Sequence, residues 1–297
     1  MNLTMGIRDL ELGGKYLGSL RDANALMGNP VALRQRMQED GYLLIRKLHD
    51  PAKVKAARRV VLENLDSNGQ IEHAGSSDLD DAHIAPRARG SFLGGAKAIT
   101  HTPEFLGVVN SPELMQFISD YLGSPALTYD YKWLRCVGNG DSTGAHYDIV
   151  YMGRGTQNLY TVWTPLGDVP YAKGPLAILG GSHQFEQIKE TYGKMDVDRD
   201  HVTGSFSNDP VELVDKYGGR WLTSEFEMGD ALIFGMFTMH GSLTNITHQY
   251  RLSCDTRYQS ANEKVDERWI GENPIAHYAW MQGDTVTMED ARARWGV

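Results

Sequence analysis

The sequence predicts a mainly β domain, a sandwich or barrel, with helices packed around it. Short strand-like runs follow one another after residue 126 and are separated by Gly, Pro or Asn. Helical patterns are confined to the first 125 residues, so strands and helices do not alternate as they do in βαβ proteins. No internal repeat or linker divides the 297 residues. We therefore expect one domain over residues 1–297.

The first 125 residues are predicted to form a largely helical buttress for the β core. A polar segment up to Pro30 is expected to be loosely ordered. A capping residue followed by proline marks the start of a helix, and glycine marks its end. These signals and the apolar spacing predict helices over 31–40, 51–65 and 114–122, a buried strand over 42–45 and a long loop over 66–100.

The β core is expected between residues 126 and 260, and residues 261–297 are interpreted as a C-terminal extension. Each predicted strand is a short apolar or alternating run bounded by turn residues. The predicted strands cover 126–137, 145–151, 158–164, 176–179, 231–237 and 251–258.

Composition and charge limit the classes of protein to which the chain can belong. The formal net charge is −9, which disfavours nucleic acid or an anionic membrane as a partner, because both attract basic surfaces. Cys136 and Cys254 lack metal-binding spacing and lie in apolar contexts, as expected for buried free thiols in a reducing compartment. The first residues lack a secretory signal, and no apolar run approaches membrane-spanning length. These observations predict a cytoplasmic protein.

A histidine and an aspartate at alternate positions, His146 and Asp148, are the first candidate for a functional site. On a β-strand, residues two apart project from the same face, so this imidazole and this carboxylate would lie together. They would supply two of the three ligands of a facial triad, which is typical of non-haem Fe(II) oxygenases. The dipeptide spacing alone is a weak signal, and it requires a second histidine downstream.

The second histidine is His240, at the end of an apolar strand that a Gly229-Asp230 turn begins. Two neutral imidazoles and one carboxylate leave an Fe(II) site with a net charge of +1, which suits an anionic chelating ligand such as 2-oxoglutarate. The distal carboxylate of that ligand would then need a bidentate donor. Arg251 begins the next strand, and Ser242 shares the face of His240.

These residues, taken in order, resemble the phytanoyl-CoA dioxygenase family of Fe(II)- and 2-oxoglutarate-dependent oxygenases. The resemblance covers most of the chain and implies a double-stranded β-helix, the jelly roll of cupin-like proteins, with flanking helices. One departure is Gly180, where the family's loop usually has proline. Further matching segments are Asp40-Gly41-Tyr42-Leu43-Leu44-Ile45, Trp163-Thr164-Pro165-Leu166, Gly174-Pro175-Leu176, Gly180-Gly181-Ser182-His183 and Gly229-Asp230.

The resemblance also implies residue roles and an activity. His146, Asp148 and His240 would ligate Fe(II). Arg251 and Ser242 would hold the distal carboxylate of 2-oxoglutarate, and the residues lining its pocket would include Trp163 and Lys97. The implied activity is oxidation, chiefly hydroxylation, of a C–H bond in a small organic molecule, with consumption of O2 and release of succinate and CO2.

Two other functions remain open on the same fold: a cupin-like metalloenzyme that does not use 2-oxoglutarate, and a catalytically idle small-molecule-binding protein. A carboxylate clamp at Arg251 and Ser242 would argue against the first, and a complete triad against the second. Residues 187–219 are interpreted as a lid, because they lie between core strands and carry several glycines.

Several polar residues have a simpler structural explanation. His183 follows a Gly-Gly-Ser turn and is expected to hydrogen-bond within the loop. Arg135 either extends to solvent or faces an anionic substrate. Three aspartates imitate the start of a calcium loop, but glycine is missing at its sixth position and glutamate at its twelfth. We therefore interpret Asp196, Asp198 and Asp200 as a solvated face.

Overall fold

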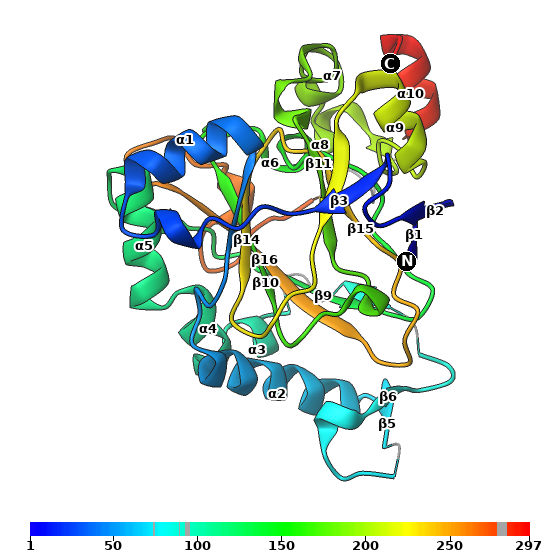
Figure 1. Cartoon of the computed structure of the whole chain (residues 1–297). Coiled ribbons are helices and arrows are strands. Elements are labelled where there is room, and N and C mark those ends of the chain that lie inside the picture. The colour runs from blue at the N-terminus through cyan, green and yellow to red at the C-terminus, as the bar shows by residue number, and fades with distance from the viewer. Residues whose placement is uncertain (74, 89, 93–95, 278–283) are drawn as a thin grey trace.

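Two β-sheets lie face to face and enclose a buried interior, as in a jelly roll (Figure 1). The computed structural model describes residues 1–73, 75–88, 90–92, 96–277 and 284–297. The larger sheet has the order β4-β14-β10-β16-β9-β7, with β8 also paired to β16, and the smaller has the order β15-β11-β13-β3. Their bounds are β3 Leu17–Ser19, β4 Tyr42–Ile45, β7 Ser91–Phe92, β8 Ala126–Thr128, β9 Trp133–Val137, β10 Tyr160–Pro165, β11 Leu176–Gly180, β13 Arg220–Thr223, β14 Ala231–Gly235, β15 His240–Ser242 and β16 Arg251–Ser260.

The strand β16 shows how the larger sheet separates two environments. Its side chains alternate between the two faces, and all ten residues are buried. Leu252 and Cys254 belong to an apolar cluster with side chains of the helices outside the sheet. The opposite face of β16 points into the jelly roll and is polar throughout: Arg251, Ser253, Asp255, Arg257 and Gln259. A row of buried polar side chains at the centre of a fold requires partners.

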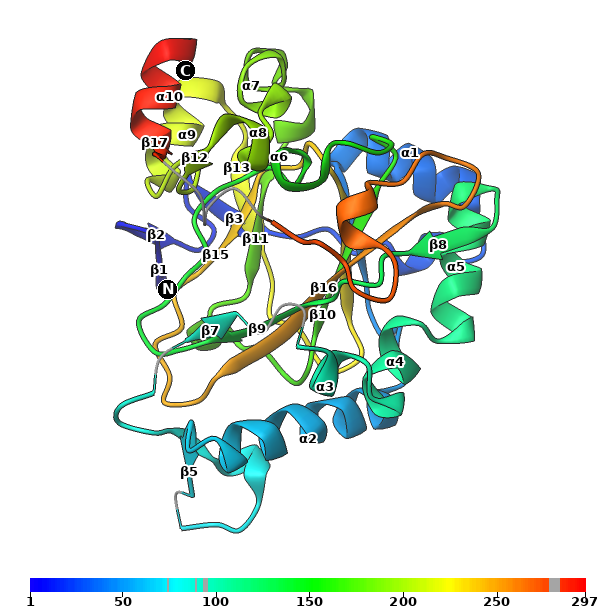
Figure 2. The same ribbon diagram turned by 180° about the vertical axis from the view of Figure 1, so that it is seen from behind.

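Helices cover the outer face of the larger sheet. The helices α2 (Pro51–Ser67) and α4 (Pro103–Val109) pack over β9 and β16, and α1 (Pro30–Asp40) and α5 (Pro112–Leu122) pack beside β4 and β14. The helices α7 (Glu186–Glu190), α9 (Pro210–Tyr217) and α10 (Met288–Trp295) gather at the end of the molecule remote from α2 (Figure 2). Within the described ranges, no helix combines the length and apolar composition that a membrane span requires.

The three predicted helices are present as α1, α2 and α5, with ends within two residues of the prediction. Asn29, Asp50 and Ser111 each accept a hydrogen bond from a backbone N–H in the first turn of the helix that follows, and proline occupies the first helical position. Gly41 and Gly123 end their helices in the left-handed conformation. Both cysteines are buried and free, as expected.

The expectation of a loosely ordered N-terminus is wrong. The strands β1 (Asn2–Met5) and β2 (Arg8–Glu11) form an antiparallel hairpin, and β3 pairs in parallel with β13 at the edge of the smaller sheet. Leu3, Met5 and Leu17 are buried in the main apolar cluster. These apolar residues therefore anchor the segment, although the runs that contain them are too short to show a periodicity in the sequence. The predicted loop over 66–100 likewise contains short elements: β5 (Ile71–Glu72), β6 (His83–Ile84), β7 and the helix α3 (Lys97–Thr100).

Two predicted strands are interrupted. The run 126–137 divides into β8 and β9, because residues 129–132 leave the ladder between them. The run 145–151 contains only isolated bridges at Ala145 and His146, after which the chain enters the short helix α6 (Ile149–Met152). The remaining predicted strands match β10, β11, β14 and β16 to within a few residues.

The segment interpreted as a lid is built into the fold. Besides α7 and α9 it contains α8 (Val197–Asp200) and β12 (Val202–Thr203), which pairs with β17 (Val286–Thr287) of the C-terminal extension. Ile188, Tyr192 and Phe206 are buried in the main apolar cluster. Opening of the whole segment would expose these side chains to water.

Candidate metal centre and cosubstrate pocket

Three potential metal ligands meet at the centre of the jelly roll. His146 and His240 are direct neighbours in an antiparallel bridge, and their backbones exchange hydrogen bonds of 2.9 and 3.1 Å. One ligand atom each of His146, Asp148 and His240 lies within 4.8 Å of the others. All three residues are buried. Among the described residues, no other group of His, Cys, Asp or Glu is arranged in this way.

The geometry that unites the ligands differs from the one predicted. Asp148 does not continue a strand: its backbone is helical, with φ −69° and ψ −28°, and it directly precedes α6 without capping that helix through its side chain. The turn into α6 therefore brings its carboxylate back toward His146. His240 does not end β14, which stops at Gly235; it begins β15 in the opposite sheet. The three ligands therefore lie at points where the chain leaves one sheet or passes to the other.

Hydrogen bonds to the backbone fix the tautomer of both histidines. His146 Nδ1 lies 2.9 Å from the carbonyl oxygen of Gly144, and His240 Nδ1 lies 2.9 Å from that of Thr238. A carbonyl can only accept, so each Nδ1 carries the proton and each Nε2 keeps a lone pair. Both Nε2 atoms lie 3.8 Å from Asp148 Oδ1. This spacing leaves room for one ion bound to all three atoms.

The second oxygen of Asp148 is held from the larger sheet. Oδ2 accepts a hydrogen bond from the Thr161 hydroxyl and lies 3.2 Å from Arg257 Nη2. Thr161 on β10 and Arg257 on β16 are cross-strand partners in register. The two residues therefore orient the carboxylate and leave Oδ1 to face the histidines.

Electrostatics keep the triad in the protonation state that a metal needs. Burial, followed by the proximity of His240, lowers the pKa of His146 to about 3, and burial also lowers the pKa of His240. Burial by itself would raise the pKa of Asp148, but Arg257 and the two histidines outweigh it and hold this pKa well below its usual range. At neutral pH the site therefore offers two neutral imidazoles and one carboxylate, a donor set that suits Fe(II).

The predicted clamp residue Arg251 is buried, and no carboxylate of the described residues forms an ion pair with it. Its side chain donates to Ser253 Oγ over 2.6 Å, while its Nε has no hydrogen-bond partner among the described residues. The guanidinium lies 5.8 Å from the ring of Trp163, which is itself fully buried. Burial, and then the charge of Arg135, lower the pKa of Arg251 to about 10. A buried cation with unused donors indicates a site for an anion.

The other two residues predicted to bind the cosubstrate, Ser242 and Lys97, lie in different surroundings. Ser242 is fully buried and accepts a hydrogen bond from the backbone N–H of Thr143 at 2.9 Å, which leaves its hydroxyl proton to donate. Lys97 lies on α3, and its Nζ is 3.4 Å from Asn273 Oδ1. It is not among the described residues that line the cavity at the triad.

A cavity of about 220 Å³ opens beside His146 and Asp148. Sequence reasoning placed only these two residues there and left Arg135 undecided; the structure places Arg135 in the cavity wall. Of the residues that sequence reasoning did not place in this wall, Arg257 could have been found from the polar alternation along 251–259. The others come from segments with no motif. The remaining lining residues are Trp133, Thr143, Tyr151, Met152, Ser205, Arg257 and His277.

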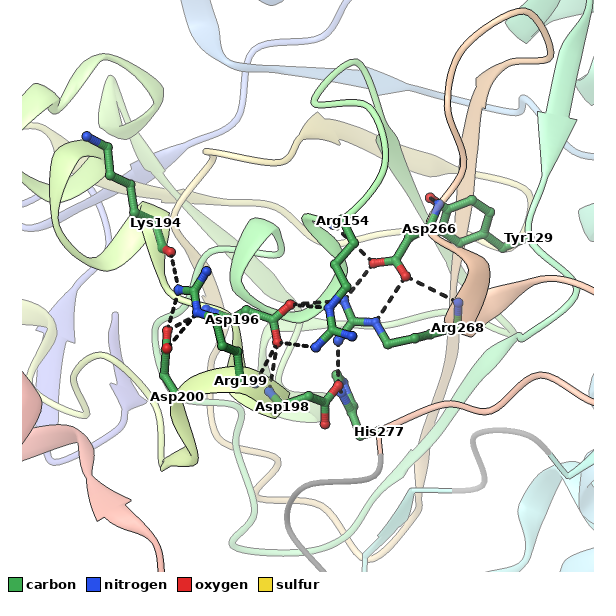
Figure 3. Close-up of polar contacts among 10 residues, drawn as sticks. All are labelled: Tyr129, Arg154, Lys194, Asp196, Asp198, Arg199, Asp200, Asp266, Arg268 and His277. Atoms are coloured by element: carbon green, nitrogen blue, oxygen red, sulfur yellow. Dashed lines mark hydrogen bonds and ion pairs between the residues drawn. The ribbon is translucent and has the colours of Figure 1, made fainter.

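The prediction of a solvated face at residues 196–200 is wrong for two of the three aspartates (Figure 3). Asp198 is buried, forms an ion pair with Arg268 and lies 2.9 Å from Nδ1 of His277. Asp196 is also buried and receives two hydrogen bonds from Arg154. Arg268 and Arg154 lie far from these aspartates in sequence, so the acidic run alone did not predict the ion pairs. Asp200 alone stays partly exposed, paired with Arg199.

The same network ties the C-terminal extension to the metal cavity. Arg268 also pairs with Asp266, so three carboxylates and two guanidinium groups lie together behind the cavity (Figure 3). His277 is both a partner of Asp198 and part of the cavity wall. The extension therefore contributes to the site itself.

A jelly roll that presents two histidines and one carboxylate from its interior defines the class of the facial-triad non-haem iron oxygenases. The sequence profile described as Phytanoyl-CoA dioxygenase (PhyH) matches residues 37–253, and the chain belongs to this family. It is therefore a 2-oxoglutarate-dependent non-haem iron dioxygenase, with Fe(II), 2-oxoglutarate and O2 as cofactors. The predicted family, fold class, enzyme class and cofactors are confirmed.

Relatives support the same placement. Two enzymes named 1-deoxypentalenic acid 11-beta-hydroxylase, from Streptomyces exfoliatus and Streptomyces arenae, are each 26% identical over 81% of this chain and 85% of their own length. The carbocyclase SnoK from nogalamycin biosynthesis aligns with a TM-score of 0.57 and 19% identity, over 83% of this chain and 89% of SnoK. EctD from S. alaskensis aligns with a TM-score of 0.56 and 17% identity, over 88% and 90%. At these identities the two structures show a shared fold.

Proposed function

We propose that the protein hydroxylates a C–H bond of a small organic molecule, binding Fe(II) through His146, Asp148 and His240. Arg251 and Ser242 hold the distal carboxylate of 2-oxoglutarate, and Trp163 forms the wall against which Arg251 packs. The relatives named as hydroxylases support the reaction type. One oxygen atom of O2 enters the product and the other enters succinate, as 2-oxoglutarate loses CO2.

The observation that carries the proposal is the buried guanidinium of Arg251, whose Nε has no hydrogen-bond partner among the described residues, in the same interior as a preorganised triad. A cupin-like enzyme without a keto-acid cosubstrate has no use for such a cation, whose burial costs free energy. A catalytically idle binding protein has no use for two histidines locked in the metal-binding tautomer. Both alternatives leave these features unexplained.

The chain's own contribution is orientation and exclusion of water. Bound iron supplies the oxidising chemistry with 2-oxoglutarate and O2. Thr161 and Arg257 keep Asp148 in one orientation, and the backbone carbonyls of residues 144 and 238 do the same for the histidines. The aromatic side chains of Trp133 and Tyr151 exclude water from the cavity in which the substrate would lie.

Titration calorimetry under anaerobic conditions tests the assignment of the clamp. We expect Arg251→Leu to bind Fe(II) as the wild type does, and to bind 2-oxoglutarate at least about tenfold more weakly, because a charge-assisted pair is lost. Ser242→Ala should weaken 2-oxoglutarate binding to a smaller extent. Arg59→Leu is the matched control, since Arg59 is exposed on α2 and pairs with Glu63. Unchanged 2-oxoglutarate affinity in Arg251→Leu would contradict the proposal.

A further inference from the structure

Arg257, which holds the carboxylate of Asp148, is itself held by few polar contacts. Its Nη2 lies 3.2 Å from Asp148 Oδ2, and its Nε donates to the thioether sulfur of Met152 over 3.1 Å. A thioether is only a weak acceptor. Its Nη1 is buried and has no hydrogen-bond partner among the described residues. The polar contacts of Arg257 therefore leave one nitrogen of its guanidinium without support.

A further contact of this guanidinium is with an aromatic ring. The guanidinium carbon of Arg257 lies 4.6 Å from the centre of the Trp133 ring, within the range of a cation–π interaction. Trp133 is buried and lines the metal cavity. An indole ring is rigid, so the stacked guanidinium keeps its plane as long as the ring stays in place. The ring thus supplies a constraint that the hydrogen bonds of Arg257 do not.

The ring of Trp133 is fixed in turn by two other aromatic side chains. Its centroid lies 4.7 Å from that of Tyr131 and 4.8 Å from that of Trp269, and these two lie 5.1 Å apart. Trp269 is fully buried and belongs to the C-terminal extension. Both Arg257 and Trp269 lie beyond residue 253, at which the match to the family profile ends. The family match therefore does not cover this support of the metal site.

We propose that Trp133 is a positioning residue of the metal centre, which acts on Asp148 through Arg257. The proposal rests on the proposed metal site and adds the residue that keeps its carboxylate ligand oriented. With the ring in place, the guanidinium stays beside Oδ2, and Oδ1 faces the histidines before a metal arrives. Without the ring, Arg257 gains rotamers that leave Asp148. Part of the free energy of metal binding is then used to restore the orientation.

Anaerobic titration calorimetry with Fe(II) tests this proposal without a primary substrate. We expect Trp133→Met to bind Fe(II) about three- to thirtyfold more weakly, the factor that corresponds to the free energy of a cation–π contact. Trp133→Phe keeps a smaller ring and should bind Fe(II) about threefold more weakly. An Fe(II) affinity equal to that of the wild type in Trp133→Met would overturn the proposal.

A second ring stacked on a guanidinium provides a matched control. Phe206 is buried, and the guanidinium carbon of Arg292 lies 4.6 Å from the centre of its ring, the same distance as in the Trp133 pair. Arg292 forms its ion pair with Glu212, which is not a proposed metal ligand. Phe206→Met should therefore lose stability, because a buried ring is removed, and keep the Fe(II) affinity of the wild type. An equal loss of Fe(II) affinity in Phe206→Met would indicate general loosening of the core and would contradict the proposal.

A double-mutant cycle tests the route through Arg257. Arg257→Gln should itself weaken Fe(II) binding about tenfold. No guanidinium then remains for the ring to hold, so adding Trp133→Met or Trp133→Phe should leave the Fe(II) affinity of Arg257→Gln unchanged. The Trp133→Phe pair keeps the cycle measurable if Trp133→Met does not fold. The same loss in both backgrounds would show that Trp133 does not act through Arg257 and would refute the inference. A wild type that does not bind Fe(II) would instead refute the proposed function.

Discussion

Replacing Arg251 by methionine should stabilise the metal-free protein while abolishing its response to the cosubstrate. In the absence of a ligand, the buried cation Arg251 has a hydrogen bond to the Ser253 hydroxyl and the ring of Trp163 nearby, and the charge of Arg135 adds to the cost of keeping it charged. Methionine has a similar length, no charge and the flexibility to pack against Trp163. The substitution therefore removes a desolvation cost and creates little empty space.

The structure gives the size of the effect. Burial and Arg135 lower the pKa of Arg251 to about 10. Because one pKa unit corresponds to about 1.4 kcal/mol, keeping this guanidinium charged costs on the order of 3 kcal/mol. Replacement of an uncompensated buried charge by an apolar side chain should raise the free energy of unfolding by about 1 to 3 kcal/mol.

Urea denaturation of the metal-free protein measures the first part of this prediction, and thermal unfolding with Zn(II) and N-oxalylglycine measures the second. We expect the wild type to gain thermal stability from this 2-oxoglutarate analogue and Arg251→Met to gain none. The exposed control Arg59→Met should behave as the wild type. A loss of more than about 1 kcal/mol in Arg251→Met would show that Arg251 is well compensated without a ligand, and a retained N-oxalylglycine response would show that it is not the clamp.

Three further predictions concern a hydrogen bond that orients Asp148 and two other buried ionisable residues, Asp198 and His49, of which His49 lies beside the Thr164 hydroxyl and away from the site. Thr161→Val should lower Fe(II) affinity about tenfold by calorimetry, because Asp148 loses an orienting hydrogen bond; unchanged affinity would dismiss that role. Burial lowers the pKa of His49 to about 4. Below about pH 6.5 this histidine is therefore protonated in the unfolded chain but neutral in the folded chain. The free energy of unfolding should fall by up to about 3 kcal/mol as pH drops from 6.5 to 4. His49→Leu should flatten that dependence in urea titrations at several pH values, and an equal slope would contradict it. Asp198→Asn should lower the free energy of unfolding by about 3 to 5 kcal/mol. Asp200→Asn should lower it by less than about 1 kcal/mol, because the ion pair of Asp200 with Arg199 is partly exposed. Equal small losses in both variants would mean that the buried network is not stabilising.

Local signals in the sequence were sufficient to predict three helices of the first half, α1, α2 and α5. A capping side chain and a proline act within one turn, so their effect does not depend on distant residues. The same signal is present at Thr102-Pro103 and Asp209-Pro210, which begin α4 and α9, and it could have predicted both helices. The apolar residues of the N-terminal hairpin carry no such signal, because their burial depends on strands more than a hundred residues away.

The ligand set was predictable because its residue types follow a motif, but its geometry was not. Nothing in His146-Tyr147-Asp148 distinguishes a strand from a turn into a helix, since the start of α6 is held by a distant partner, the Met236 carbonyl that accepts from the Ile149 N–H. Asp196 and Asp198 look solvated in sequence because their partners Arg154 and Arg268 are distant. Arg257 was visible only as one member of an alternating strand, and its contact with Asp148 required the register of β10 and β16.

The measurement that tests the central claim most directly is an anaerobic titration of the protein with Fe(II) and 2-oxoglutarate, followed by visible absorption. Chelation of Fe(II) by a keto acid produces a charge-transfer band that neither component gives alone. We predict this band for the wild type with one Fe(II) per chain, no band for Asp148→Ala, and a band for Arg251→Leu only at higher 2-oxoglutarate concentration. A wild type without the band, or Asp148→Ala with the band at wild-type Fe(II) affinity, would contradict the assignment of this site.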